Sequence, residues 1–360
     1  MGLNRSTIGG LVSELESLGL AEQSKSVGTR VGVGRPSVDV VGGSKPYVLA
    51  IDVRVDGLTV ARVGLGGIVQ ARATGPVAAG HDPDATADSI ADLARLVQKE
   101  IEPGAMLVGV AVGVPGMVRA DDGLVRLAPN LGWRELPFAD LLVERLGLTC
   151  RPSLGNDADL GAVAEHLRGA GVGVDDLVYL SGEVGVGAGI VVGGRPLHGS
   201  GGYAGEIGHL PFASGGQTCH CGARGCWETV IGAAAIAKAI GCPDDRIPQL
   251  GEFLNDIDKT PPALREVARD LGRGLAGVVN LFNPRVVVLG GYLRSLYPLV
   301  EAEVLEALAE EALVAPWEMV QIALPGLRGD SVLLGAAELA FAGLLADPVA
   351  QLASDSGHNG

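Results

Sequence analysis

Hydrophobic positions along the chain follow two periods, one typical of strands and one typical of helices. In the first half, strands are expected at residues 47–53, 58–63, 67–74, 106–114 and 149–153. Helices are expected at residues 83–100, 138–146 and 156–169. The run from Met106 to Val114 is almost wholly apolar, which is typical of a buried central strand. Residues 117–137 lack either period, and we interpret them as a long connection.

The second half of the chain repeats this alternation around a glycine-rich turn. Strands are expected at residues 177–181, 187–192, 285–289 and 320–323. Helices are expected at residues 231–240, 247–254, 262–282, 294–312 and 331–345. Two blocks of strands and helices predict a duplicated α/β architecture whose two lobes enclose a cleft, the usual place for a small ligand.

These patterns divide the chain into four expected regions. Residues 1–45 form an N-terminal region, and residues 46–135 form a first α/β lobe, against which the C-terminal helix 331–346 packs back. Residues 136–330 form a second α/β lobe. The last residues, 347–360, are small and polar, and we expect a disordered tail.

The N-terminal region predicts a helix followed by a hairpin. Apolar residues between Ile8 and Leu18 form a stripe along a helix at residues 4–19, and a strand that starts at Leu20 pairs with residues 37–41. The segment between the two strands is rich in glycine and carries two arginines, an order typical of a winged helix. In that interpretation the DNA-binding residues are Asn4, Arg5, Ser6 and Thr7 in a major groove, with Arg30 and Arg35 on phosphates or in a minor groove.

A small helical appendage without DNA contacts is the alternative interpretation of this region. A helix-turn-helix needs a first helix ahead of the recognition helix, and only three residues precede Asn4. The winged helix-turn-helix is therefore expected to be incomplete, through a misplaced start, a truncation or a loss of function.

Composition narrows the class of protein. Hydrophobic residues make up 47% of the chain, aromatics only 4%, and glycines number 56, which suits buried strands wrapped by helices. The net charge of −15 excludes a protein that binds nucleic acid through a surface that is basic all over. The first 45 residues carry a charge of +1 and the rest −16, so the N-terminal region differs from the remainder of the chain. The sequence has no signal peptide and no run of ~18 apolar residues. We therefore expect a cytoplasmic protein with no membrane partner.

Three of the five cysteines fall within eight residues, as Cys219, Cys221 and Cys226, and His209 precedes them. These four side chains supply the number and kind of ligands that a closed tetrahedral zinc site needs, so we predict structural Zn²⁺. Glycines at 222 and 225 allow the backbone to turn the three sulfurs inward. The alternatives are His220 in place of His209, or three reduced structural cysteines. Cys150 and Cys242 are interpreted as ordinary buried thiols.

The segment Gly205–His209 followed by Cys219–Glu228 resembles the zinc signature of the ROK family (repressors, open reading frames and sugar kinases). The resemblance extends over most of the chain through Val114–Gly116, Pro129–Trp133, Asn156–Asp157, Gly199–Ala204 and Asn283–Gly291. The N-terminal region, with Gly34-Arg35-Pro36 at its end, is similar to the xylose-repressor-like branch of transcriptional regulators. The resemblance implies an α/β, duplicated, two-lobed actin/hexokinase-like (ribonuclease H-like) fold.

The resemblance also implies the residues that hold a sugar. Carried over to this sequence, they are Asn130, Asn156, Asp157, Glu206, His209 and Glu228. Carboxylates and amides match the vicinal hydroxyls of a sugar, and a zinc-bound histidine can donate its second N–H to a hydroxyl. Taken singly, the Asn156-Asp157 pair is more typical of a helix cap, and Glu206 and Glu228 are more typical of surface charge. Within this ordered set of motifs, we interpret them as the sugar site.

In the kinases of this family, the counterpart of Asp157 is the general base, so Asp157 is a catalytic candidate if the chain is a kinase. The turns that bind nucleotide phosphates depart from the kinase pattern. The first turn reads Asp52-Val-Arg-Val-Asp56-Gly57 where kinases have Asp-x-Gly-Gly-Thr, and the second reads Glu183-Val-Gly where kinases have Gly-Thr-Gly. Glu183 adds a negative charge beside a triphosphate, a repulsion of ~1 kcal/mol or more.

Because these departures fall on the nucleotide and none falls on the sugar, the sequence favours a sensor over an enzyme. We interpret the chain as a sugar-responsive transcriptional regulator with a sugar or sugar phosphate as effector. A homodimer, or a dimer of dimers, would place two winged helices on a palindromic operator in double-stranded DNA. The alternatives are a cytoplasmic ATP-dependent sugar kinase (glucokinase-like) with divergent phosphate loops, and a binding module that is neither enzyme nor repressor.

Overall fold

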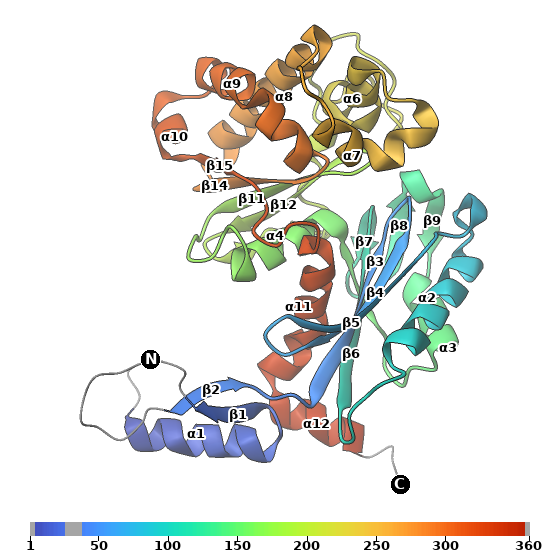
Figure 1. Ribbon diagram of the computed structural model, residues 1–360, viewed down its shortest axis with the longest axis vertical. Coiled ribbons are helices and arrows are strands. Elements are labelled where there is room, and N and C mark those ends of the chain that lie inside the picture. The colour runs from blue at the N-terminus through green and yellow to red at the C-terminus, as the bar shows by residue number, and fades with distance from the viewer. Residues whose placement is uncertain (1–3, 26–37, 357–360) are drawn as a thin grey trace.

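The computed structural model describes residues 4–25 and 38–356, which form two α/β lobes and a small N-terminal module (Figure 1). The first lobe carries a five-stranded sheet in the order β10-β6-β3-β4-β5, and the second carries a five-stranded sheet in the order β13-β12-β11-β14-β15. Each sheet mixes parallel and antiparallel pairs. The duplicated α/β architecture expected from the sequence is confirmed.

The first sheet forms as the apolar pattern predicts, with all eight residues of its central strand β3 buried. Its strands are β3 (Pro46–Val53), β4 (Leu58–Gly64), β5 (Ile68–Gly75), β6 (Met106–Val114) and β10 (Ser153–Asn156). β6 pairs in parallel with β3 on one side and with β10 on the other. The carboxyl ends of these three parallel strands therefore deliver Asp52, Val114 and Asn156 to one edge of the sheet.

One face of the first sheet is covered by α2 (Pro83–Val97) and α3 (Phe138–Leu146). Ile90, Phe138 and Leu142 are fully buried in this core. The same core contains Val125 and Trp133 from a small antiparallel sheet of β7 (Met117–Arg119), β8 (Leu124–Ala128) and β9 (Trp133–Leu136).

Three expectations for this lobe are corrected. Residues 117–137 are a three-stranded sheet rather than a plain connection. The strand expected at 149–153 lies at 153–156, because its position is set by pairing with β6. The expected lobe boundary at residue 135 cuts through one core, since α3 and β10 belong to the first lobe.

The second sheet consists of β11 (Leu177–Gly182), β12 (Val186–Val192), β13 (Arg195–Pro196), β14 (Val286–Gly291) and β15 (Gln321–Ala323). One of its faces packs against the helical half of the lobe. Those helices are α5 (Glu228–Ile231), α6 (Ala233–Ile240), α7 (Leu250–Asn255), α8 (Pro262–Phe282), α9 (Leu293–Glu311) and α10 (Val314–Met319). β11 runs parallel to β14, so Gly182 and Gly291 meet at the carboxyl edge of this sheet.

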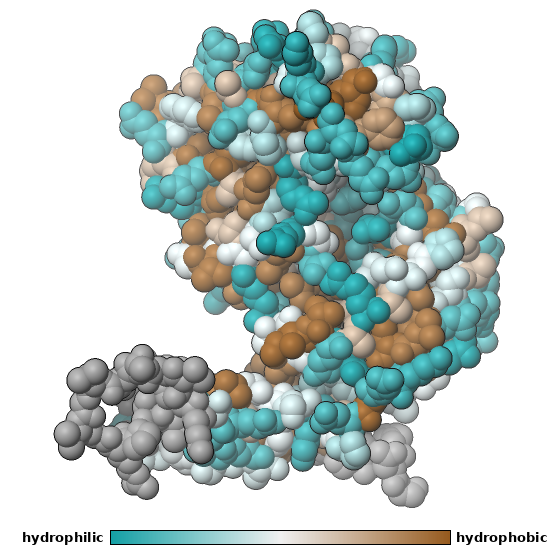
Figure 2. Space-filling view, viewed as in Figure 1, coloured by the Kyte–Doolittle hydropathy of each residue, from teal (hydrophilic) through white to brown (hydrophobic). Residues whose placement is uncertain are grey.

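Two helices, α4 (Asp157–Arg168) and α11 (Ser331–Ala346), join the lobes at the waist of the molecule (Figure 1). α4 packs Ala162 against Tyr179 and Val288 of the second sheet. α11 packs Leu333 and Ala337 against the first sheet. Much of the visible surface of the upper lobe is teal, and brown residues gather at the waist (Figure 2).

A buried carboxylate ties these two helices together. Glu165 on α4 is 0% exposed, and it accepts hydrogen bonds from the amides of Ala170, Gly326 and Leu327 at 2.8, 2.9 and 3.1 Å. It also accepts one from Ser331 Oγ at 2.7 Å, at the first residue of α11. Because four donors satisfy one fully buried acid, this contact fixes the start of α11 relative to α4.

The N-terminal module consists of α1 (Arg5–Ser17) and the antiparallel pair β1 (Ala21–Lys25) and β2 (Val38–Gly42). This is the helix-then-hairpin order that the sequence predicted for a partial winged helix-turn-helix. Leu15, Leu18 and Leu20 pack in one core with Phe341 and Leu344 of α11. The module therefore stands on the end of α11 that is distant from the cleft (Figure 1).

The C-terminal segment corrects a further expectation. Residues 348–356, expected to be part of a disordered tail, form α12 (Pro348–Ser356), which begins right after α11 and lies beside the N-terminal module (Figure 1). Residues 357–360 lie outside the described part of the chain. None of the described helices is long and apolar enough to cross a membrane.

Candidate functional site

Four side chains converge in the long segment that connects β13 to α5. The ligand atoms of His209, Cys219, Cys221 and Cys226 all lie within 4.8 Å of one another. Cys219 Sγ is 3.6 Å from His209 Nδ1, and Cys221 Sγ is 3.7 Å from Cys226 Sγ. The residues that the sequence selected as metal ligands are therefore brought together, with His209 rather than His220 as the fourth.

The backbone of this segment folds into a tight double turn. Isolated bridges pair Pro211 with Cys226 and Thr218 with Arg224. Gly222 and Gly225 have φ values of +93° and +73°, a region that side chains rarely adopt, and a Cβ on Gly225 would stand 1.9 Å from the Ala213 carbonyl. Only glycine fits at position 225, so the sequence expectation of sharp glycine turns is confirmed.

The residues that follow the last cysteine anchor the segment to the second lobe. Trp227 is 2% exposed in the core of that lobe, and its Nε1 donates to the Asp270 carbonyl on α8 at 2.9 Å. Glu228 faces the cluster from the other side. Its Oε1 accepts from Cys219 Sγ at 3.3 Å, and its Oε2 accepts from the Val186 amide at 2.9 Å.

The donor set fits a structural metal ion of the zinc type. Three sulfurs and one imidazole nitrogen are soft or borderline ligands, and all four positions come from the protein. Burial raises the pKa of the Cys219 and Cys226 thiols. A bound cation would therefore be needed for these thiols to ionise at neutral pH.

His209 connects this cluster to the cleft between the lobes. Its Nδ1 points toward Cys219, while its Nε2 lies 3.8 Å from Oε2 of Glu206. The side chains of His209 and Glu206 remain 27% and 37% exposed. One ring nitrogen thus faces the metal ligands and the other faces a carboxylate that solvent or a ligand can reach.

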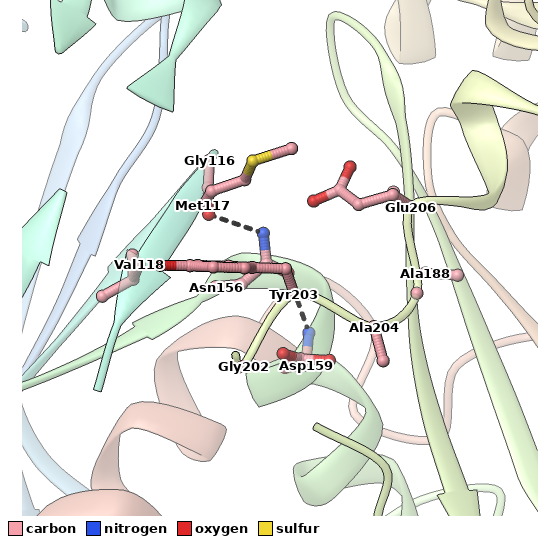
Figure 3. Close-up of a pocket in the computed structure, with 12 residues that line it drawn as sticks. Gly116, Met117, Val118, Asn156, Asp159, Ala188, Gly202, Tyr203, Ala204 and Glu206 are labelled. Carbon is pink, nitrogen blue, oxygen red and sulfur yellow. Dashed lines mark hydrogen bonds between the residues drawn. The ribbon is translucent and has the colours of Figure 1, made fainter. Parts of the chain in front are cut away.

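A pocket lies beside Glu206, with about 310 Å³ of empty space when the part open to solvent is included. Its lining includes Met117, Asn156, Asp159, Tyr203 and Glu206. Glu206 projects into it from the segment after Ala204, opposite the residues at the start of α4 (Figure 3).

The six expected sugar residues are distributed around this pocket unequally. Asn156 and Glu206 line the pocket. His209 is not among the lining residues, but its Nε2 lies 3.8 Å from the Glu206 carboxylate. Asp157 follows Asn156 directly and interacts electrostatically with Glu206. Glu228 is held by Cys219 and the Val186 amide, and Asn130, in a short 3-10 turn (Pro129–Leu131), is not among the lining residues.

Asn156 and Asp157 form the start of α4. Asn156 is the N-cap: its Oδ1 accepts from the amides of Ala158 and Asp159, and its Nδ2 donates to the Gly116 carbonyl at 3.0 Å. The helix-cap interpretation of Asn156 is therefore correct, and the same residue lines the pocket. Burial, followed by the carboxylates of Asp52 and Glu206, raises the pKa of Asp157 to about 7.

Sequence reasoning did not select Asp159 and Tyr203, which line the same pocket. Asp159 lies in the first turn of α4, two residues beyond the Asp157 that the family resemblance identified. The signal that would have found it is the helix itself, because residues of the first turn share the end that faces the cleft.

The two turns that depart from the kinase pattern carry charged side chains that lie near one another. Arg54 Nε lies 3.1 Å from Asp56 Oδ1, and the guanidinium also interacts electrostatically with Asp52 and Glu183. Glu183 Oε1 lies 3.0 Å from the place that a Cβ on Gly291 would take. Surrounding protein, together with Asp52 and Asp157, raises the pKa of the exposed Glu183 carboxyl. Charged side chains therefore stand at both turns where the sequence departs from the kinase pattern.

The expected DNA-binding residues are placed in part. Asn4 is the N-cap of α1, and its Oδ1 accepts from Ser6 Oγ at 2.7 Å and from Thr7 Oγ1 at 3.0 Å. These three exposed polar residues gather at the N-terminus of α1. Arg5 begins the helix. Arg30 and Arg35 lie outside the described residues.

The fold and the site together define a class: a two-lobed α/β protein of hexokinase-like architecture with a Cys3His cluster beside the cleft. The sequence profile of the ROK family matches residues 48–342, and the chain belongs to this family. The resemblance drawn from the motifs is thereby confirmed.

Individual relatives include both regulators and kinases. The xylose repressor of Caldicellulosiruptor bescii is 27% identical over 369 residues, which cover 96% of this chain and 90% of that protein. The crystal structure of a ROK family transcriptional regulator, a homologue of the E. coli MLC protein, has a TM-score of 0.74 at 25% identity, covering 93% of this chain and 88% of its own. A ROK glucokinase from Streptomyces griseus, in complex with glucose and AMPPNP, has a TM-score of 0.66 at 27% identity, covering 82% of this chain and 99% of its own.

Proposed function

We propose that this protein is a sugar-responsive transcriptional regulator that binds a carbohydrate effector between its lobes and operator DNA through its N-terminal module. The single observation that carries the proposal is the pair of charged side chains, Arg54 and Glu183, in the region where a kinase would hold nucleotide phosphates. Together with Asp52 and Asp56, Glu183 makes this region acidic and unfavourable for a triphosphate, and the Arg54 guanidinium is engaged by Asp56.

The extent of similarity also supports a regulator. The xylose repressor and the solved ROK regulator cover 96% and 93% of this chain, whereas the glucokinase covers 82%. The chain also carries a helix and a hairpin ahead of the first lobe, in the order of a winged helix. Two copies of this module would reach two half-sites of a palindromic operator, so the proposal includes a homodimer.

In this proposal, Asn130, Asn156, Asp157, Glu206, His209 and Glu228 bind the effector. Zn²⁺ held by His209 and the three cysteines would fix the orientation of the imidazole, leaving Nε2 for Glu206 or a sugar hydroxyl. The metal is then structural, and the carboxylate and imidazole beside it recognise the sugar.

α11 offers a route from the cleft to the DNA-binding module. It starts at Ser331, which is bonded to Glu165 of α4, and it ends in the core that holds Leu18 and Leu20. A change in the angle between the lobes would move one end of this helix and hence the module at the other. The sugar needs only to bind the DNA-competent and DNA-incompetent states with different affinity.

A sugar kinase is the second candidate, and one observation favours it. The pKa of Asp157 is raised to about 7, close to the value at which a carboxylate serves best as a general base at neutral pH. The experiment that separates the two candidates is an ADP-release assay with a panel of hexoses and pentoses, run beside calorimetry on the same sugars. We expect a sugar that binds without turnover. Turnover that disappears in Asp157→Asn would overturn the proposal in favour of the kinase.

A further inference from the structure

The pocket beside Glu206 contains a second acidic side chain, that of Asp159. Asp159 lines the pocket, half-buried, in the first turn of α4. Its amide donates to Asn156, but across the described residues no hydrogen-bond donor or cation partners its carboxylate. A partly buried carboxylate without a donor is costly, and a ligand that brings a donor would satisfy it.

The surroundings of Asp159 are negative. Partial burial, followed by the carboxylates of Asp157 and Glu206, raises its pKa to about 7. The lining of the pocket contains no lysine, arginine or histidine. The nearest charged residue on β7, Arg119, is engaged by Asp122, with its Nε 2.8 Å from Asp122 Oδ1. Arg54, in the first turn that departs from the kinase pattern, forms an ion pair with Asp56.

The acidic lining of this pocket favours sugars that donate hydrogen bonds and disfavours sugars that carry a phosphate. Hydroxyl or ammonium groups can donate to Asp159 and Glu206. A phosphate ester would bring up to two negative charges into a pocket that has two carboxylates and no cation, and a buried anion without a partner is strongly disfavoured.

We infer that the effector is an unphosphorylated sugar, neutral or amine-bearing, which donates a hydrogen bond to Asp159, and that Asp159 is the residue that excludes phosphorylated sugars. The inference rests on the proposed sugar-binding function and narrows it. It assigns to Asp159 a role in specificity that is separate from the roles of Asn156, Asp157 and Glu206.

The test is calorimetry with matched pairs of ligands on the full chain. Xylose, glucose, glucosamine and N-acetylglucosamine are each titrated beside the corresponding phosphate ester. We expect one parent sugar to bind at least ~100-fold more tightly than its phosphate ester. Asp159→Asn removes the charge but keeps the size of the side chain. It should lower the affinity for the parent sugar by about 10-fold and reduce the ratio of the two affinities by about 10-fold.

Asp175→Asn, at an exposed position after α4, makes the same change in net charge and should leave the ratio unaltered. If a phosphate ester binds as tightly as its parent sugar, or more tightly, the inference is wrong while sugar sensing stands. An unchanged ratio in Asp159→Asn would remove Asp159 from the specificity of the site. If none of the eight compounds binds the wild-type protein, the proposed function itself fails.

Discussion

Nε2 of His209 lies 3.8 Å from Oε2 of Glu206, while Nδ1 of the same ring faces the cysteine cluster. One imidazole therefore connects the metal-type site to the pocket. A metal ion held by four protein ligands would not contact the sugar. It would still affect sugar binding, because it fixes the orientation of the imidazole and hence the direction of Nε2.

Separate substitutions should distinguish metal binding from sugar binding. Cys221→Ser should lose the metal and weaken sugar binding, because His209 is then free to rotate. Glu206→Ala should weaken sugar binding by ~10-fold or more through the loss of a charged acceptor, yet retain the metal. Metal content by atomic emission and sugar affinity by calorimetry check both. Sugar binding at wild-type affinity in metal-free Cys221→Ser would contradict the link through His209.

The phosphate turns lead to a prediction about nucleotide. The wild-type protein should show no saturable binding of a non-hydrolysable ATP analogue with Mg²⁺, because Glu183 lies in an acidic cluster with Asp52 and Asp56 and the Arg54 side chain takes the place of a glycine. Arg54→Gly combined with Glu183→Gly removes both obstacles and should give measurable affinity in calorimetry. Equal binding of the analogue by the wild type and the double variant would show that these side chains do not block the nucleotide.

The buried Glu165 should hold the waist of the molecule together. Glu165→Ala leaves three backbone amides and Ser331 Oγ without their acceptor, so the free energy of unfolding should fall by about 3 kcal/mol or more in urea titrations. Glu310→Ala, at an exposed position on α9, should stay within about 0.5 kcal/mol of the wild type. Matching values for the two variants would mean that the network adds nothing to stability.

Stability should fall as the pH rises from about 4 to about 7. The folded-state pKa values of Asp52, Asp157 and Asp159 are raised to about 6, 7 and 7, each chiefly by burial. Because the folded state favours the protonated form of each group, the stability that they contribute is complete below their unfolded pKa and is lost as pH passes the folded pKa.

Asp159→Asn removes one of these groups, so its melting temperature should fall less over that interval than the melting temperature of the wild type. Thermal unfolding by circular dichroism at matched salt gives the comparison, and the difference between the two proteins cancels any common loss of metal. Parallel pH profiles for wild type and variant would argue against a raised pKa at Asp159.

Much of the architecture was predictable because long apolar periods dominate it. The strand at residues 106–114 and the helix at residues 262–282 were placed at their observed limits from the sequence pattern. Four-residue β10 was misplaced because its limits depend on pairing with β6, a contact far away in the sequence. The small sheet at residues 117–136 was missed for the same reason, since strands of three to five residues carry too short a pattern.

The metal-type cluster was predictable because its ligands lie close together in the sequence and the glycines between them fix the turns. The pocket was not, because Met117, Asp159 and Tyr203 come together only through the packing of β7, α4 and the segment before Glu206. The sequence also indicated that Arg54 and Glu183 depart from the kinase pattern, but not that the two side chains would lie near enough to interact electrostatically.

The most direct test of the account measures DNA binding with and without sugar. A labelled fragment of the DNA upstream of the protein's own gene is titrated with the full chain by fluorescence anisotropy at about 0.15 M salt. The titration is repeated with the sugar that calorimetry identifies at saturating concentration. The account predicts specific binding whose affinity changes at least ~10-fold with the sugar, and a loss of this response in Glu206→Ala. Failure to bind the fragment more tightly than unrelated DNA, or an affinity that the sugar leaves unaltered, would contradict it.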